Sequence, residues 1–304
     1  MDNQEIKKVR RTKTSGNHVF SLLIPTWNNL EYLKLCVRSI RQNSRHPHQI
    51  ILLVNEGIDG SLAWVEQQKD IDYVYAPENL GICFGLNACR SLVHTDYIVY
   101  INDDMYVLPG WDDLLLKEIQ QLDHRSFMLS STMIEPYDIK NICGIVKNYG
   151  DSPENFKENL LLQEFQQLEK PDWSGSTWPP VLVPVDLWDK VGGMSVEFSP
   201  GMYSDPDLSM KLWQAGVRYF KGLGQSRVYH FGSKSTKRIK KNRGRNMFLQ
   251  KYGITSRYFV KHFLKRGERF AGPLVEPDIP FQDKIMHKIK LFLLLFHDHP
   301  FPKK

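Results

Sequence analysis

Short apolar runs alternate with longer amphipathic segments through the first hundred residues. The runs VFSLLI (19–24), QIILLV (49–54) and YIVYI (97–101) are short and almost uniformly apolar, which predicts buried strands. Between the first two, a helix is expected to begin at Asn28, because apolar residues then recur at helical spacing: Leu33, Cys36, Val37 and Ile40. This order predicts an α/β fold with a mostly parallel, Rossmann-like sheet flanked by helices.

The second half of the chain has a less regular pattern. The segment 148–180 is rich in loop-forming residues, and SDPDLSMKLWQAG (204–216) has the apolar spacing of a helix with Asp205 near its start. Further strands are expected where short apolar stretches recur, at 73–75, 128–134, 181–183 and 227–231.

Positive charge is concentrated in one part of the chain. The net charge of the chain is +6, but the stretch from Lys234 to Arg266 holds twelve Lys or Arg and no acid. The net charge of all other residues together is therefore −6. Such a block suits nucleic acid, anionic lipid headgroups or phosphorylated substrates, and it equally suits a solvated basic pair of helices. No zinc-finger, RNP or helix-turn-helix signature accompanies it, so nucleic acid is an unlikely partner.

The C-terminal segment from residue 281 is amphipathic at helical spacing, with apolar residues among Lys284, Lys288 and Lys290. It is expected either to lie on a membrane surface or to pack on its own domain or a partner. The basic N-terminus has no apolar region of a signal peptide, and no apolar run approaches the length of a bilayer-spanning helix. Four cysteines without a CxxC pair favour a reduced, cytoplasmic chain, with peripheral association at the inner face of a membrane as an option.

Polar residues gather where the predicted strands end. Thr26-Trp27-Asn28 follows the first strand, Asn55-Glu56 the second, and Asn102-Asp103-Asp104 the last of the regular series. Ligands of parallel α/β sheets bind beyond such carboxyl ends. GxGxxG and GxxxxGK[ST] phosphate loops are absent, so a nucleotide here would need another counter-charge, such as a divalent cation held by a carboxylate. Taken alone, the NDD sequence is more typical of a capping or Asx turn.

The ordered set of motifs resembles the large inverting family two of glycosyltransferases with the GT-A fold. SLLIPTWNN, ILLVNEGIDGS and ENLGICFGLN are similar to the nucleotide-binding segments, and INDD stands where the family has its DXD motif. VDLWDKVGGM and SDPDLSMKLWQAG resemble the acceptor-side loop and the helix with the catalytic base. The resemblance covers about residues 18–260. It implies a nucleotide-sugar-binding half (18–130), an acceptor-binding half (131–235), and flanking segments: a basic tail (1–17) and a basic helical extension (236–304).

The resemblance also implies roles for individual residues. Asp205 matches the general base and Asp207 is the second acid of the same turn; Asp104 matches the metal ligand for Mn²⁺ or Mg²⁺, and His230 a further ligand of some members. The acceptor side would include Trp173, Trp178, Gly192 and Gly193, the tryptophans either stacking on a sugar or simply packing. The nucleotide sugar would contact Pro25, Thr26, Trp27, Asn28, Asn55, Glu56, Asn79, Gly81, Asn102 and Asp103.

The implied activity is metal-assisted transfer of a sugar, with inversion, from a nucleotide-diphosphate sugar to a hydroxyl of a glycan or lipid-linked acceptor. A carboxylate at a helix start is favoured as the anion by the helix dipole, which would suit Asp205 as a base. Asn55 and Asn102 are amides where the family commonly has acids. They support the alternative of a catalytically inactive module that binds nucleotide sugars or glycans.

Overall fold

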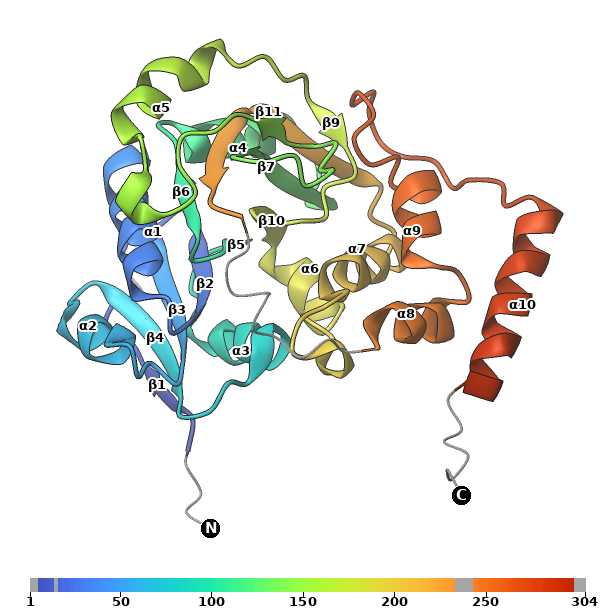
Figure 1. The fold of residues 1–304 in the computed structure, drawn as a ribbon, viewed down its shortest axis with the longest axis horizontal. Coiled ribbons are helices and arrows are strands. Elements are labelled where there is room, and N and C mark those ends of the chain that lie inside the picture. Colours follow the sequence, from blue (N-terminus) through green and yellow to red (C-terminus); the bar gives the residue numbers. More distant parts are fainter. Residues whose placement is uncertain (1–4, 14–15, 233–242, 298–304) are drawn as a thin grey trace.

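The first half of the chain forms the predicted parallel sheet. The computed structural model describes residues 5–13, 16–232 and 243–297 (Figure 1). Four strands run parallel in the order β4-β3-β2-β5, and three helices connect them. The strands are β2 (Ser21–Trp27), β3 (Gln49–Asn55), β4 (Ile71–Ala76) and β5 (Tyr97–Tyr100). The helices are α1 (Leu30–Asn43), α2 (Ser61–Gln67) and α3 (Gly81–Cys89).

The second half extends the same sheet with mixed strand directions. β10 (Val181–Pro184) is antiparallel to both β5 and β7 (Phe127–Glu135), and β11 (Tyr219–His230) is parallel to β7. β6 (Met105–Val107) closes that edge against β11. The short strands β8 (Ile145–Val146) and β9 (Trp173–Ser174) pair with β7 and β11. The predicted α/β fold with flanking helices is confirmed, but its parallel character belongs mainly to the first half.

Two apolar layers hold helices on opposite faces of this sheet. Alternate residues of β2 point to opposite sides, so Leu22 and Ile24 join α1 and α4 (Trp111–Gln121) while Leu23 faces α3 and the helices of the second half. Gly85 lets α3 lie against β3, because a Cβ there would be 1.9 Å from a methyl carbon of Leu53. The apolar residues predicted to lie on the inner face of α1 are all buried: Leu33, Cys36, Val37 and Ile40.

Several local expectations were wrong. The chain before residue 18 is not only a tail, since Lys7–Val9 forms β1 at the sheet edge, antiparallel to β4. The first strand continues through Pro25 to Trp27, and the residue that precedes α1 as its N-cap is Asn29, not Asn28. The segment 148–180 is rich in loops as predicted, and it also contains a short helix, α5 (Glu158–Glu164).

Helices from the C-terminal part pack beside two helices of the second half of the chain. α6 (Val185–Lys190) and α7 (Ser204–Gln214) lie next to α8 (Gly244–Tyr252) and α9 (Ser256–Tyr258), which continues as a π-helical turn over Phe259–Phe263 (Figure 1). α10 (Phe281–His297) stands at the outer edge of this group. Within the ranges that the structure describes, no helix has the length and hydrophobicity needed to cross a bilayer.

Candidate active site

A cavity of about 720 Å³ opens at the carboxyl ends of β2, β3 and β5. Asp104 and Asp205, predicted from opposite halves of the sequence, both line it. The buried hydroxyl oxygen of Thr26 lines it too and has no hydrogen-bond partner among the described residues, so it can bond to a ligand. Other predicted residues in the lining are Pro25, Trp27, Asn55, Asn79, Gly81, Asn102, Asp103, Trp178 and His230.

Two residues predicted to contact the nucleotide instead support the loops around it. The Asn28 amide donates to Oε2 of Glu56 at 2.8 Å, and its oxygen accepts from the backbone of Ile58 at 3.0 Å. Both Asn28 and Glu56 have positive φ angles, and neither side chain lines the cavity. The pair therefore links the ends of β2 and β3 rather than forming the pocket wall.

Asn55 and Gly81 shape the wall of the cavity through backbone contacts. The Asn55 oxygen accepts from the backbone of Leu80 at 3.0 Å, and its amide donates to the carbonyl of Thr26. Gly81 has a φ of +72°, and a Cβ there would be 2.6 Å from Cα of Pro200. An amide at position 55 can donate to one strand end and accept from the loop before α3, which a carboxylate could not do.

Asp104, His230 and Glu135 form a buried polar row at the strand-end side of the cavity. Nε2 of His230 lies 3.4 Å from a carboxylate oxygen of Asp104, and Nδ1 lies 2.9 Å from Glu135. Burial alone would lower the pKa of His230, but the two carboxylates outweigh it and raise the pKa to about 10. The parallel pairing of β11 with β7 brings His230 beside Glu135, which the sequence analysis did not identify.

This row suits a divalent cation. A carboxylate oxygen and an imidazole nitrogen face each other, and the other ring nitrogen is held by a second carboxylate, as is usual for metal-binding histidines. No group of three or more His, Cys, Asp or Glu side chains among the described residues is arranged to hold a metal. One or two protein ligands are typical of sites where phosphate oxygens and water supply the others.

Asp205 lies in the first turn of α7 and is partly exposed to the cavity. Burial raises the pKa of this carboxyl to about 7, although the positive charge of Arg266 acts in the opposite direction. The helix start was expected to favour the anion, and desolvation by the surrounding protein dominates instead. Asp205 can therefore accept a proton near neutral pH and keep it when the solution is more acidic.

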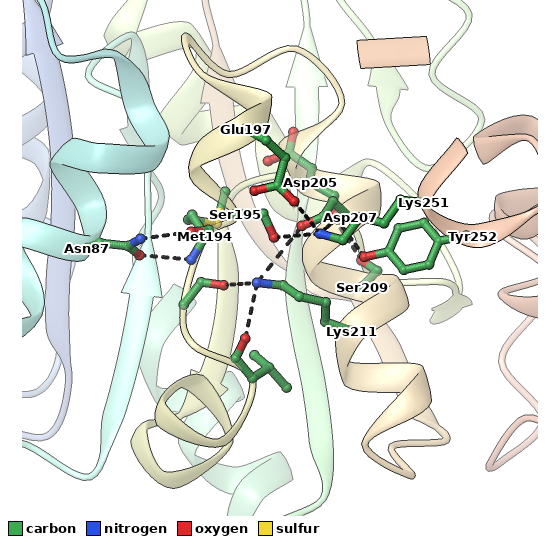
Figure 2. Close-up of polar contacts among 12 residues, drawn as sticks. Asn87, Met194, Ser195, Glu197, Asp205, Asp207, Ser209, Lys211, Lys251 and Tyr252 are labelled. Atoms are coloured by element: carbon green, nitrogen blue, oxygen red, sulfur yellow. Dashed lines mark hydrogen bonds and ion pairs between the residues drawn. The ribbon is translucent and has the colours of Figure 1, made fainter. Parts of the chain in front are cut away.

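Asp207, proposed from the sequence as a second catalytic acid, points away from the cavity. Its fully buried carboxylate accepts hydrogen bonds from Lys251 at 2.8 Å and from the Tyr252 hydroxyl at 2.6 Å, as Figure 2 shows. Lys251 also pairs with Glu197 at 2.7 Å. We call Asp207, Lys251 and Tyr252 the α7–α8 clamp, because they fasten the turn that carries Asp205 to the C-terminal helices.

The clamp predicts an effect on stability. Tyr252→Phe removes a hydrogen bond to a buried carboxylate without changing the ring, so we expect the free energy of unfolding to fall by about 2 kcal/mol. Urea denaturation measures it. Tyr137→Phe is the matched control, since Tyr137 donates to Asp151 at 2.6 Å on the exposed surface, where the change should cost less than about 0.5 kcal/mol. Equal losses in the two variants would contradict the clamp.

The residues proposed for acceptor binding separate into two groups. Trp178 lines the cavity, with the Arg266 guanidinium 3.5 Å from its ring centroid. Trp173 is buried and donates from Nε1 to Thr132 at 2.9 Å, which favours the packing alternative. Gly192 and Gly193 form a positive-φ turn after α6 and lie outside the cavity lining.

Other lining residues came from positions that the sequence analysis did not single out. They include Glu135 at the end of β7, Tyr203 before α7, and a group from the C-terminal part: Arg257, Lys261, Arg266 and Glu268. The only sequence signal for the C-terminal group was the basic block, which did not show which of its cations face a cavity.

Part of the sequence matches a known protein family and a curated relative. Residues 21–139 match the sequence model described as glycosyl transferase family 2. The glycosyltransferase GlyG of Streptococcus pneumoniae serotype 4 is 23% identical over 208 residues, which are 64% of this chain and 64% of that protein. The chain therefore matches somewhat less than two thirds of the length of this curated relative.

Solved structures show the same fold at low identity. TarS 1–349 of S. aureus in complex with UDP-GlcNAc superposes with a TM-score of 0.56 and 11% identity, covering 92% of this chain and 73% of that one. GalNAc-T7 with UDP, GalNAc and Mn²⁺ superposes with a TM-score of 0.56 and 13% identity. This superposition covers 94% of this chain and 59% of that one. Residues 21–139 thus match glycosyl transferase family 2, and the superpositions show that the chain has the GT-A fold.

Proposed function

We propose that this protein transfers a sugar, with inversion, from a nucleotide-diphosphate sugar to a hydroxyl of a glycan or lipid-linked acceptor, assisted by Mn²⁺ or Mg²⁺. The observation that carries the proposal is that Asp104, after a central strand, and Asp205, at a helix start, line one cavity. The description of GlyG as a glycosyltransferase supports the transfer reaction, and the TarS complex with UDP-GlcNAc supports a nucleotide-sugar donor.

The donor would occupy the strand-end side of the cavity. Thr26 and Trp27 would contribute the wall against the nucleoside, and the Thr26 hydroxyl, which has no partner among the described residues, would form a hydrogen bond to it. Asp104 and His230 would hold the divalent ion, and the use of such an ion is supported by GalNAc-T7, whose structure contains UDP and Mn²⁺. The bound ion would supply counter-charge to the diphosphate leaving group.

The acceptor would approach from the side of α7. Asp205 takes the proton from the attacking hydroxyl, whose oxygen forms the new bond to the anomeric carbon as the bond to the diphosphate breaks. Attack from the face opposite the leaving group inverts the anomeric configuration. Burial keeps the pKa of Asp205 close to neutral, so the carboxylate is a stronger proton acceptor than an ordinary aspartate while still ionised at pH 8.

A thermal-shift panel tests the proposal. UDP, GDP, dTDP and their sugars are added with and without Mn²⁺, because a ligand that binds the native state raises Tm. We expect one nucleotide to stabilise the chain by several degrees, more with Mn²⁺ than with EDTA. Absence of stabilisation by every nucleotide would contradict the proposed donor site.

We also propose that the protein acts at the cytosolic surface of a membrane, through α10. One side of this helix faces the body, where His287 packs against Tyr258 and Asp283 accepts from the same tyrosine. The opposite face is apolar and exposed, and Lys288 and Lys290 stand at its two edges, a pattern that suits an anionic lipid surface. The exposed apolar residues are Phe281, Ile285, Met286, Ile289, Phe292 and Leu293.

Liposome binding checks this surface. The full chain is expected to sediment with anionic vesicles and not with neutral ones, and removal of residues 281–304 should abolish the difference. Ile289→Ser with Phe292→Ser should weaken binding about tenfold or more, since two large apolar side chains are lost. Ile58→Ser with Val275→Ser is the control, because both residues are exposed apolar side chains outside α10. Unchanged binding after truncation would contradict the prediction.

A further inference from the structure

Three cations from the C-terminal part line the cavity, and we define them as the cationic rim: Arg257, Lys261 and Arg266. We propose that the cationic rim binds a phosphate ester on the acceptor, so that the enzyme glycosylates phosphorylated acceptors. This inference rests on the proposed function and identifies its acceptor by chemical class.

The packing of α9 and the following turn directs the rim toward the cavity. Phe259 and Phe263 are buried on the inner side of this segment, where both rings contact Trp213 of α7. Arg257 and Lys261 are four residues apart on the other side, exposed at the cavity, so both can approach one anion. Their direction is therefore fixed by the aromatic contacts of their neighbours.

The rim has no direct acidic partner in the part of the chain that the structure describes. Among the residues that the structure describes, no carboxylate lies within ion-pair distance of Arg257, Lys261 or Arg266, although Glu268 lines the same cavity. Arg266 is held by stacking on Trp178 and by a hydrogen bond to Asn141 at 3.0 Å. A guanidinium fixed in a cavity by neutral groups keeps its charge and further N–H donors for a ligand.

The position of the rim favours the acceptor over the donor. Arg266 lies near enough to Asp205 to oppose the rise in its pKa, and the α9 segment packs on α7, which carries Asp205. The acids Asp103 and Asp104 belong to the strand-end side instead. Anionic oxygens with several lone pairs, such as those of a phosphate ester, satisfy clustered Arg and Lys donors. The shared chemistry is the phosphate, whether it belongs to a lipid-linked or to a water-soluble glycan or polyol.

Titration calorimetry measures the binding of acceptor analogues to the cationic rim. The sample is the full chain, saturated with Mn²⁺ and with the nucleotide that raises Tm most. We expect sn-glycerol 3-phosphate to bind more tightly than glycerol, and Arg257→Gln with Lys261→Gln to weaken its binding at least about tenfold. Lys265→Gln with Arg269→Gln is the matched control, because these two exposed cations of the same segment lie outside the cavity lining. The control variant should bind like the wild type.

The outcomes separate this inference from the proposed function. If nucleotide binds but glycerol 3-phosphate and glycerol bind equally, or both double variants lose the same affinity, the phosphate site is wrong while the donor site stands. If the rim variant instead loses nucleotide affinity, the rim serves the donor and the inference is likewise overturned. A second titration compares n-octyl phosphate with glycerol 3-phosphate: tighter binding of octyl phosphate supports a lipid-linked phosphate, and equal binding supports a water-soluble one.

Discussion

Asp205→Asn is expected to lower kcat for sugar transfer by about a thousandfold, because the amide cannot accept the proton of the acceptor hydroxyl. Affinity for the nucleotide should change by less than about twofold, since Asp205 lies on the α7 side of the cavity and asparagine has nearly the same volume. Radiolabelled sugar transfer measures the first quantity and thermal shift with nucleotide the second. An inactive binding module would show neither transfer in the wild type nor any effect of this substitution.

The pH profile gives a second, independent measure of the same residue. The base must be ionised, and burial raises the pKa of Asp205 to about 7, so kcat/KM should rise with pH up to about 7 and level off above it. An ordinary exposed aspartate would give a plateau already above about pH 5. If Asp205→Asn lost transfer and nucleotide affinity equally, the assignment as base would fail.

Asp104→Asn is expected to weaken the binding of Mn²⁺ to the nucleotide-loaded protein by at least about a hundredfold. Substituting residues that only hydrogen-bond to metal ligands already lowers metal affinity about ten- to a hundredfold, and Asp104 is a proposed ligand itself. The readout is Mn²⁺-dependent stabilisation by the nucleotide, so it does not depend on activity. Stabilisation by nucleotide in EDTA should remain, since the proposed nucleoside wall of Thr26 and Trp27 is unchanged.

Asp103→Asn is the matched comparison for the metal site. Asp103 is the neighbouring carboxylate and lines the same cavity, but the described His230 contact is made by Asp104. Asp103→Asn is therefore expected to weaken Mn²⁺ binding less than Asp104→Asn. A larger loss of Mn²⁺ binding from Asp103→Asn than from Asp104→Asn would move the metal ligand to the neighbouring residue.

The strands and site residues predicted correctly are those that can be recognised from residues adjacent in the sequence. Strands such as QIILLV are buried on both faces and are recognisable by composition, and the polar residues that follow them necessarily reach one sheet edge. Asp104 and Asp205 could be predicted to share a cavity for that reason, together with the family resemblance. The charged strand Lys7–Val9 was missed because only pairing with β4, and not its own composition, makes it a strand.

Residues that depend on distant contacts could not be assigned correctly from the sequence. The spacing of Asp207 from Asp205 in the sequence does not show whether its side chain faces the cavity or α8. Only the position of α8, which brings Lys251 and Tyr252 to Asp207, decides this. Glu135 reaches the site through strand pairing, and Arg266 through stacking on Trp178. The pKa of Asp205 was misjudged for a similar reason, because burial is a property of the assembled cavity and not of a helix start.

The α7–α8 clamp has a consequence for engineering this protein. The family model matches residues 21–139, whereas the turn that carries Asp205, the proposed proton acceptor, is anchored by side chains beyond residue 250. A fragment that ends before α8, or a chimaera that exchanges the C-terminal helices for those of a relative, would leave the Asp207 carboxylate buried without Lys251 and Tyr252. Such hybrids should fold and catalyse sugar transfer only when Asp207, Lys251 and Tyr252 are transferred together.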